Sequence, residues 1–225
     1  QNPQAIGKGT DWFDILLQDA ITQNYNLGLS AAGEKFKSAV NINYNAKEGV
    51  ILNTYSNRFA ARANNVYEAS DRVSFGLNVS GSYTIGQLTD GLAGGRYIIG
   101  SAMLMDPQLK YKNDDGTYPI AYTQPGMFAN PNYYLVLTQR QNPSKTFRGT
   151  VNAYTDIKII DGLKYRLSAN ADLANNSRSN WIPSTANGAM FSAPPQPATG
   201  SYHTSNYVNW LLENTLTYNK TIAND

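Results

Sequence analysis

The sequence predicts an all-β, antiparallel fold of about seven long strands, of the kind that forms part of a transmembrane β-barrel. First, apolar and polar residues alternate with a period of two along most of the chain, as in strands whose two faces meet different surroundings. Second, the alternating runs are about 11 to 14 residues long, whereas strands average five or six residues. Third, the connections are alternately short and long, as in outer-membrane barrels.

The first four strands are expected within residues 23–86. The alternation begins at Asn24, reverses at Gly33-Glu34-Lys35, and continues over residues 36–45 and, less regularly, 58–68. After the turn Ser70-Asp71-Arg72, the fourth strand is the most regular. Its apolar face carries Val73, Phe75, Leu77, Val79, Tyr83 and Ile85.

Two further strands are expected within residues 146–176, joined by the turn Asp161-Gly162, and the last within 207–225, which also holds a periplasmic turn. Long extracellular loops are expected over 87–145 and 177–206. Residues 1–22 are predicted to hold a short amphipathic helix with Thr10 as its N-cap. Residues 97–105 predict a second loop helix, which ends at Asp106-Pro107.

Composition excludes several other classes of protein. The 225 residues carry a net charge of +2 and no cysteine, which argues against electrostatic nucleic-acid binding and excludes disulfide scaffolds and thiolate zinc sites. No run of 18 apolar residues predicts a transmembrane helix. The chain is rich in asparagine (26) and tyrosine (16), and its polar faces suit a hydrated lumen. Tyrosines near the strand ends predict an interfacial girdle: Tyr25, Tyr44, Tyr67, Tyr83 and Tyr218.

The order and spacing of seven segments resemble those of the SusC/RagA family of TonB-dependent outer-membrane transporters. They are Gly9–Asp14, Gln23–Leu27 with its turn at 33–35, Asn43–Gly49, Met105–Pro107, Asn113–Tyr118, Ile160–Arg166 and Asn209–Tyr218.

The resemblance implies a 22-stranded barrel, of which this chain would supply about the second to eighth strands, with residues 1–22 at the end of an extracellular loop. Family members are several times longer and carry a plug domain, which is not recognisable in these residues. Seven strands cannot close such a barrel, so the remainder of the barrel and the plug are expected partners. The resemblance also implies a SusD-like surface lipoprotein, the TonB complex acting through the plug, outer-membrane lipid, and import of oligosaccharides or peptides into the periplasm.

No catalytic residue, metal site or cofactor is predicted, and an enzyme is the least expected function. His203 is the only histidine and is expected to be an exposed loop residue, while Asp114-Asp115-Gly116 is expected to be an ordinary turn. Aromatic residues in the outer loops are the candidate substrate-binding residues, because rings stack on sugars and hold peptide side chains. They are Tyr97, Tyr111, Tyr118, Tyr122, Phe128, Tyr133, Tyr134, Trp181 and Tyr202, and Phe191 lies in the same loops.

Three alternatives stay open at this point. Any single one of these rings could instead pack within its own loop. The chain could belong to a non-transport barrel subunit of a larger outer-membrane assembly. It could also be a soluble β-sandwich that binds glycans, with its apolar face forming the core.

Overall fold

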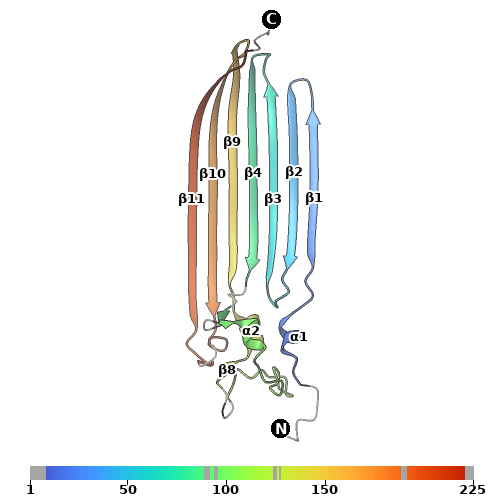
Figure 1. The fold of residues 1–225 in the computed structure, drawn as a ribbon, viewed down its shortest axis with the longest axis vertical. Coiled ribbons are helices and arrows are strands. Elements are labelled where there is room, and N and C mark those ends of the chain that lie inside the picture. The colour runs from blue at the N-terminus through green and yellow to red at the C-terminus, as the bar shows by residue number, and fades with distance from the viewer. Residues whose placement is uncertain are drawn as a thin grey trace.

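A single seven-stranded antiparallel sheet dominates the structure, with loops and short helices gathered at one end (Figure 1). This computed structural model describes residues 9–88, 92–93, 96–123, 126, 128–188 and 192–220. The sheet follows chain order: β1 (Thr22–Ala32), β2 (Phe36–Glu48), β3 (Tyr55–Glu68), β4 (Val73–Gln87), β9 (Pro143–Ile160), β10 (Leu163–Ile182) and β11 (Thr199–Tyr218). The predicted all-β fold and its seven strands are confirmed.

The last two strands are longer than the alternation predicts. β10 runs to Ile182 and β11 begins at Thr199, so the connection between them spans only 183–198 rather than 177–206. In the added part, polar residues such as Ser177 and Thr204 face each other. Backbone pairing does not require an apolar face, so the ladder continues where the sequence pattern has already stopped. Each strand has 20 residues and spans roughly 65 Å.

The outward face of the sheet carries two aromatic rows. The register sets five rings side by side near the loop end, one from each of five neighbouring strands: Tyr25, Tyr44, Phe59, Tyr83 and Phe147. Near the turn end it aligns Phe36, Tyr67 and Phe75. Phe59 and Tyr67 lie eight positions apart on β3, or about 26 Å at 3.3 Å per residue. The rows therefore bound a band about as tall as the apolar belt of a membrane barrel.

Within this band, the outward side chains are aliphatic, alanine or glycine, except Ser38 and Asn65, which share a hydrogen bond (2.7 Å). Most of the larger aliphatic side chains are exposed. Leu29 is 62% exposed and Leu27 is 56% exposed. Among the described residues, no buried hydrophobic side chain lies on the seven-stranded sheet, and no second sheet covers this face. The sandwich alternative fails, because a sandwich buries its apolar face against a second sheet.

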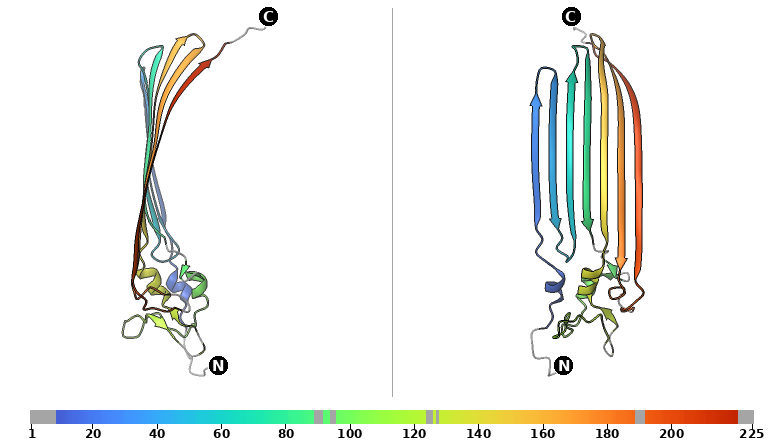
Figure 2. Two further views of the ribbon diagram at one scale, coloured as in Figure 1. Left: turned by 90° about the vertical axis from the view of Figure 1, so that its left-hand side faces the viewer. Right: turned by 180° about the vertical axis from the view of Figure 1, so that it is seen from behind.

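The opposite face is concave. Figure 2 shows the sheet twisting and curving at its turn end towards the side on which the loop region lies. The tight turn between β9 and β10 uses Gly162, whose φ of 81° is a conformation that favours glycine.

Several connections pack together in the loop region, which comprises the described parts of residues 9–21, 49–54, 88–142 and 183–198. It contains α1 (Trp12–Leu16), α2 (Ile98–Ala102), α3 (Tyr133–Gln139) and four two-residue strands: β5 (Leu92–Ala93), β6 (Arg96–Tyr97), β7 (Ala121–Tyr122) and β8 (Asn130–Pro131). Its core consists of Trp12, Leu16, Ile98, Ala102, Met105, Leu109, Tyr122, Tyr133, Val136 and Leu137. In the part of the chain that is described, no helix is long and apolar enough to span a membrane.

Hydrogen bonds join these connections to one another. Asn53 Nδ2 donates to the carbonyl of Leu137 (2.9 Å), and the Arg140 guanidinium donates to the carbonyl of Ala186 (2.8 and 2.9 Å). The loops therefore hold one another in place through contacts between segments that are far apart in the sequence.

Two details of these helices differ from the prediction. The N-cap of α1 is Asp11 rather than Thr10, because Asp11 Oδ1 accepts hydrogen bonds from the amides of Phe13 (3.0 Å) and Asp14 (3.2 Å). The helix expected over 97–105 is present but shorter, as α2. The sequence pattern also missed α3, whose β-branched and aromatic residues are typical of strands.

Candidate functional site

The concave face is polar and continuously hydrogen-bonded across four strands. Asn78 Nδ2 donates to Asn152 Oδ1 (2.9 Å), Asn152 Nδ2 donates to Asn170 Oδ1 (2.5 Å), and Asn170 Nδ2 donates to Glu213 Oε2 (3.1 Å). The register places the two inner pairs directly opposite one another on β4, β9 and β10. This row orients the side chains of a surface that water would otherwise leave mobile.

Arginines also line this face. The register places Arg58 and Arg62 on β3 and Arg148 on β9 among hydroxyl and small side chains. Arg148 lies 3.4 Å from Asp172, while Arg62 Nε donates to Asn64 Oδ1 (3.3 Å). The period of two sets these arginines opposite the apolar residues of their own strands, but a local pattern cannot show that β3 and β9 lie close together.

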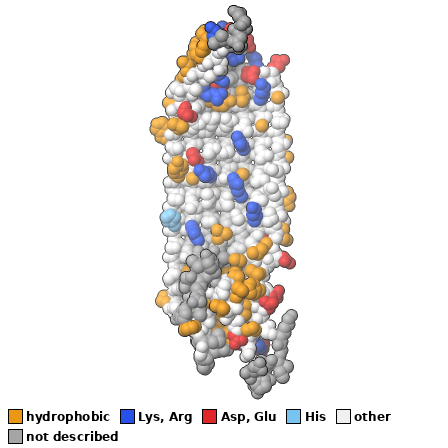
Figure 3. Space-filling view, viewed as in Figure 1, with side chains coloured by type: hydrophobic (Ala, Val, Ile, Leu, Met, Phe, Trp, Pro, Cys, Tyr) orange, Lys and Arg blue, Asp and Glu red, His pale blue; other side chains and the backbone are white. Residues whose placement is uncertain are grey.

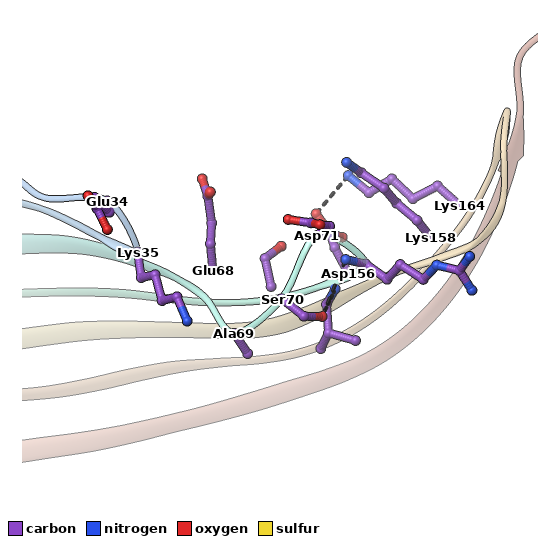
Figure 4. A pocket seen from close by; sticks show the side chains of 12 residues that line it. Glu34, Lys35, Glu68, Ala69, Ser70, Asp71, Asp156, Lys158 and Lys164 are labelled. Carbon is purple, nitrogen blue, oxygen red and sulfur yellow. Dashed lines mark hydrogen bonds and ion pairs between the residues drawn. The ribbon is translucent and has the colours of Figure 1, made fainter.

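Charged side chains cluster at the turn end of the same face (Figure 4). Lys164 Nζ lies 2.7 Å from the Asp156 carboxylate, and Arg166 donates to both of its oxygens. On β2 and β3, Lys37 and Glu68 form a second ion pair at 2.9 Å. The hollow between these groups, about 690 Å³ in volume, is lined by Glu34, Lys35, Glu68, Ala69, Ser70, Asp71, Arg72, Val73, Ser74, Asp156, Lys158 and Lys164.

One aromatic ring anchors this charged cluster. The Arg166 guanidinium lies over the ring of Tyr154, 4.3 Å from its centroid. Tyr154 in turn covers Gly76 so closely that a Cβ built there would meet the ring at 2.0 Å. The absent side chain at Gly76 is thus what lets Tyr154 lie flat against β4.

The predicted outer-loop rings separate into two groups. Tyr122 and Tyr133 are buried, at 8% and 0% exposure, in the core of the loop region, and burial raises the pKa of the Tyr122 phenol above its usual value. Trp12 packs edge-on against Tyr122, 5.9 Å between centroids. Tyr122 and Tyr133 therefore pack within the loop region, as one of the alternatives above expects.

Tyr111, Tyr118 and Tyr134, the tyrosine cluster, are half-buried and contact one another. Tyr118 and Tyr134 stack at 5.3 Å, and Tyr111 meets Tyr134 edge-on at 5.3 Å. Burial, with Tyr118 beside it, raises the pKa of the Tyr134 phenol. The Lys112 ammonium lies 5.5 Å from the Tyr118 centroid. This cluster leaves parts of three rings at the surface of the loop region.

Three of the remaining candidate rings are exposed. Trp181, Phe128 and Tyr202 are 47%, 57% and 71% exposed, and Trp181 and Tyr202 lie on β10 and β11 rather than in a loop. Tyr97 is in β6, where only the backbone is described, and Phe191 lies outside the described residues.

The two other expectations about loop residues have different outcomes. The turn at Asp114-Asp115-Gly116 is confirmed: Gly116 N donates to the Asn113 carbonyl, and bonds from Thr117 hold the pKa of Asp115 below its usual value. His203 is exposed as expected but belongs to β11, opposite Arg178. Over the described ranges, no group of three His, Asp or Glu side chains converges to hold a metal ion.

Comparison with known proteins gives related sequences and a matching fold. TonB-dependent receptor P3 of Formosa agariphila is 28% identical over 219 residues, which cover 95% of this chain and 21% of that receptor. TonB-dependent receptor P26 of the same organism is 25% identical over 225 residues, 99% of this chain and 22% of that receptor. The chain thus spans about a fifth of the length of these relatives. No family model matches it.

Solved structures of a peptide transporter, RagAB, share the fold. One superposes with a TM-score of 0.76 at 19% identity, over 96% of this chain and 24% of the other. The open-open state of the RagAB peptide importer gives a TM-score of 0.75 over 97% and 24%. In sequence this chain is similar to TonB-dependent receptors, and its fold matches part of the RagAB transporter, as the resemblance to the SusC/RagA family predicts.

Proposed function

We propose that this chain forms part of the wall and outer loops of a SusC-like transporter that imports oligosaccharides or peptides across the bacterial outer membrane into the periplasm. One observation carries the proposal: two aromatic rows about 26 Å apart bound an exposed apolar face, while the other face of the same strands is polar and charged. Lipid would cover the first face, and the second would line a hydrated lumen.

The arrangement of the connections supports an orientation. The turns at 33–35, 69–72 and 161–162 lie at one end of the sheet, and the loop region lies at the other (Figure 1). Short turns face the periplasm in outer-membrane barrels, and long loops face outside. The extended parts of β10 and β11 would then project into the medium.

Both edges of the sheet need partners. β1 and β11 each pair with one strand only, and every described residue of both is exposed. Lipid cannot satisfy the unpaired backbone groups of an edge strand. The remainder of the barrel would supply neighbours for both edges, and a plug domain would fill the lumen and link it to TonB.

The loop region would receive the substrate together with a SusD-like surface lipoprotein. The tyrosine cluster, with Trp181, Tyr202 and Phe128, offers accessible rings for stacking on sugars or for holding peptide side chains. Tyr122 and Tyr133 would support this surface from beneath, since their rings are buried.

Uptake by cells tests the proposal. A strain that lacks the full-length receptor should lose uptake of a subset of labelled oligosaccharides or peptides and regain it when the gene is restored. The receptor extracted from the outer membrane should have a mass several times that of this segment and should co-purify with a lipoprotein. Unchanged uptake in the deletion strain would instead favour a non-transport subunit of a surface assembly.

A further inference from the structure

Three arginines occupy successive levels of the polar face. Arg58 lies opposite Thr84, Arg62 lies opposite Ser80, and Arg148 lies opposite Ser82, at the level between them. At 3.3 Å per residue and 4.8 Å per strand, Arg58 and Arg62 are about 13 Å apart along β3, and Arg148 is about 10 Å to the side. The three guanidinium groups therefore border one patch of the wall.

Small and hydroxylated residues separate these arginines. A hollow of about 270 Å³ is lined by Asn41, Arg58, Ala60, Ala61, Arg62, Ser80, Gly81, Ser82, Arg148 and Thr150. A second hollow, of about 420 Å³, shares Arg62, Ser80 and Thr150 with the first. Ser80 Oγ and Thr150 Oγ1 lie 2.6 Å apart and share one hydrogen bond. The patch thus combines positive charge, open volume and hydroxyl donors.

The positive charge of this patch is not balanced locally. Among the described side chains, Asp172 forms an ion pair with Arg148 alone, at 3.4 Å, and no acidic side chain pairs with Arg58 or Arg62. At the turn end, by contrast, Asp156 and Glu68 pair with lysine and arginine. Figure 3 shows basic side chains spread along the middle of this face with few acidic ones between them.

We propose that Arg58, Arg62 and Arg148 form a binding site for a carboxylate group carried by the solute that passes this wall. This inference rests on the proposed function. Guanidinium groups bind such groups through two parallel hydrogen bonds. Of the Ser80 and Thr150 hydroxyls, the one that accepts the hydrogen bond between them would donate to a remaining oxygen. The charge excess would also concentrate anionic solutes in the lumen.

The exposure of the site fits a solute that must leave again. All three arginines are exposed, so each keeps much of its hydration until an anion arrives. A pathway needs binding that is favourable enough for entry and weak enough for release. Guanidinium groups that are spread along the strands provide several such positions in sequence.

The test uses cells in which the full-length receptor is replaced by defined variants. The cells receive a mixture of peptides and of neutral and uronate oligosaccharides, and mass spectrometry follows the loss of each component. Arg58→Gln/Arg62→Gln removes two charges from the patch. The control Lys145→Gln removes a charge from the other face of β9, since Lys145 pairs with the outward-facing Ile85.

With the wild type, acidic components should disappear about tenfold faster than neutral components of equal size, and the double variant should reduce this preference to about twofold. Uptake of neutral components should stay the same, and the control should resemble the wild type. Uptake without charge preference in the wild type would overturn the anion site and leave the transporter in place. Wild-type uptake identical to that of the deletion strain would overturn both the anion site and the proposed transport function.

Limited proteolysis shows whether the arginines bind a solute or a carboxylate of the receptor itself. If the double variant renders another part of the receptor protease-sensitive while the charge preference persists, the arginines hold a carboxylate of the same polypeptide. That result would overturn the proposal.

Discussion

Arg166 on β10 and Asp156 on β9 lie directly opposite each other and form a two-pronged ion pair: Nε donates to Oδ1 (2.5 Å) and Nη2 donates to Oδ2 (2.7 Å). Lys164 adds a third contact at 2.7 Å, and Tyr154 supports the guanidinium from below. The Asp156 side chain is only 12% exposed, so this pair is better shielded from water than an ordinary surface ion pair.

Replacing Asp156 with asparagine should destabilise the turn end, because Arg166 and Lys164 then face each other without a carboxylate. We expect a loss of about 1–3 kcal/mol, seen as a lower temperature at which the full-length receptor loses its folded band in SDS gels. Asp71→Asn is the control, since Asp71 lines the same hollow and is exposed. If both variants lowered this temperature equally, the ion pair would not be what stabilises the turn end.

Gly76→Ala should disturb the same network from the other side. A Cβ there would meet the Tyr154 ring at 2.0 Å, so the ring must move away from β4 and lose its position under Arg166. A close-packed site that receives an extra methyl group typically loses about 1–3 kcal/mol. The same gel assay measures the effect.

Gly81→Ala is the matched control on the same strand, because a Cβ there has no heavy atom within 4 Å. Its folded band should persist to the wild-type temperature. If the two variants melted alike, the contact between Gly76 and Tyr154 would not be what limits packing here.

Asn132→Ala should loosen the loop region. Asn132 is fully buried, caps α3 through the amide of Tyr134 (3.1 Å), and donates to the carbonyls of Tyr111 (2.8 Å) and Pro119 (2.9 Å). Losing a cap costs about 1 kcal/mol, and the two carbonyls lose their donor as well. Limited proteolysis of intact cells should cut this variant within residues 88–142 faster than the wild type.

Asn113→Ala is the control for this variant, because Asn113 is exposed and bonds only within its own turn. A similar cleavage rate for both variants would argue that α3 does not depend on its cap.

Leu29→Arg should impair assembly of the barrel, while Ser30→Arg should be tolerated. Leu29 lies on the outward face between the aromatic rows and is 62% exposed, so an arginine there would face lipid at a cost of about 2–4 kcal/mol near the bilayer midplane. Ser30 is the next residue on β1 and faces the other side. Comparing the folded receptor in outer-membrane fractions measures both, and equal assembly would contradict the assignment of the two faces.

The sequence predicted the element type, the number of long strands and their two faces, because a period of two is a local property. It failed where local signals are weak or ambiguous. The polar extensions of β10 and β11 carry no alternation, and the aromatic and β-branched residues of α3 are typical of strands, although Asn132 and tertiary packing make them helical.

The candidate site depended on long-range register that local patterns do not encode. A bulge between Leu163 and Lys164 shifts the pairing by one residue, and without it a two-residue hairpin would set Asp156 opposite Leu167 rather than Arg166. Similarly, the 55 residues between β4 and β9 separate Arg62 from Arg148 in the sequence. Composition and periodicity alone determined that these strands have a polar and an apolar face; only the tertiary structure decided which charges meet, because side chains interact across strands whose register the whole sheet sets.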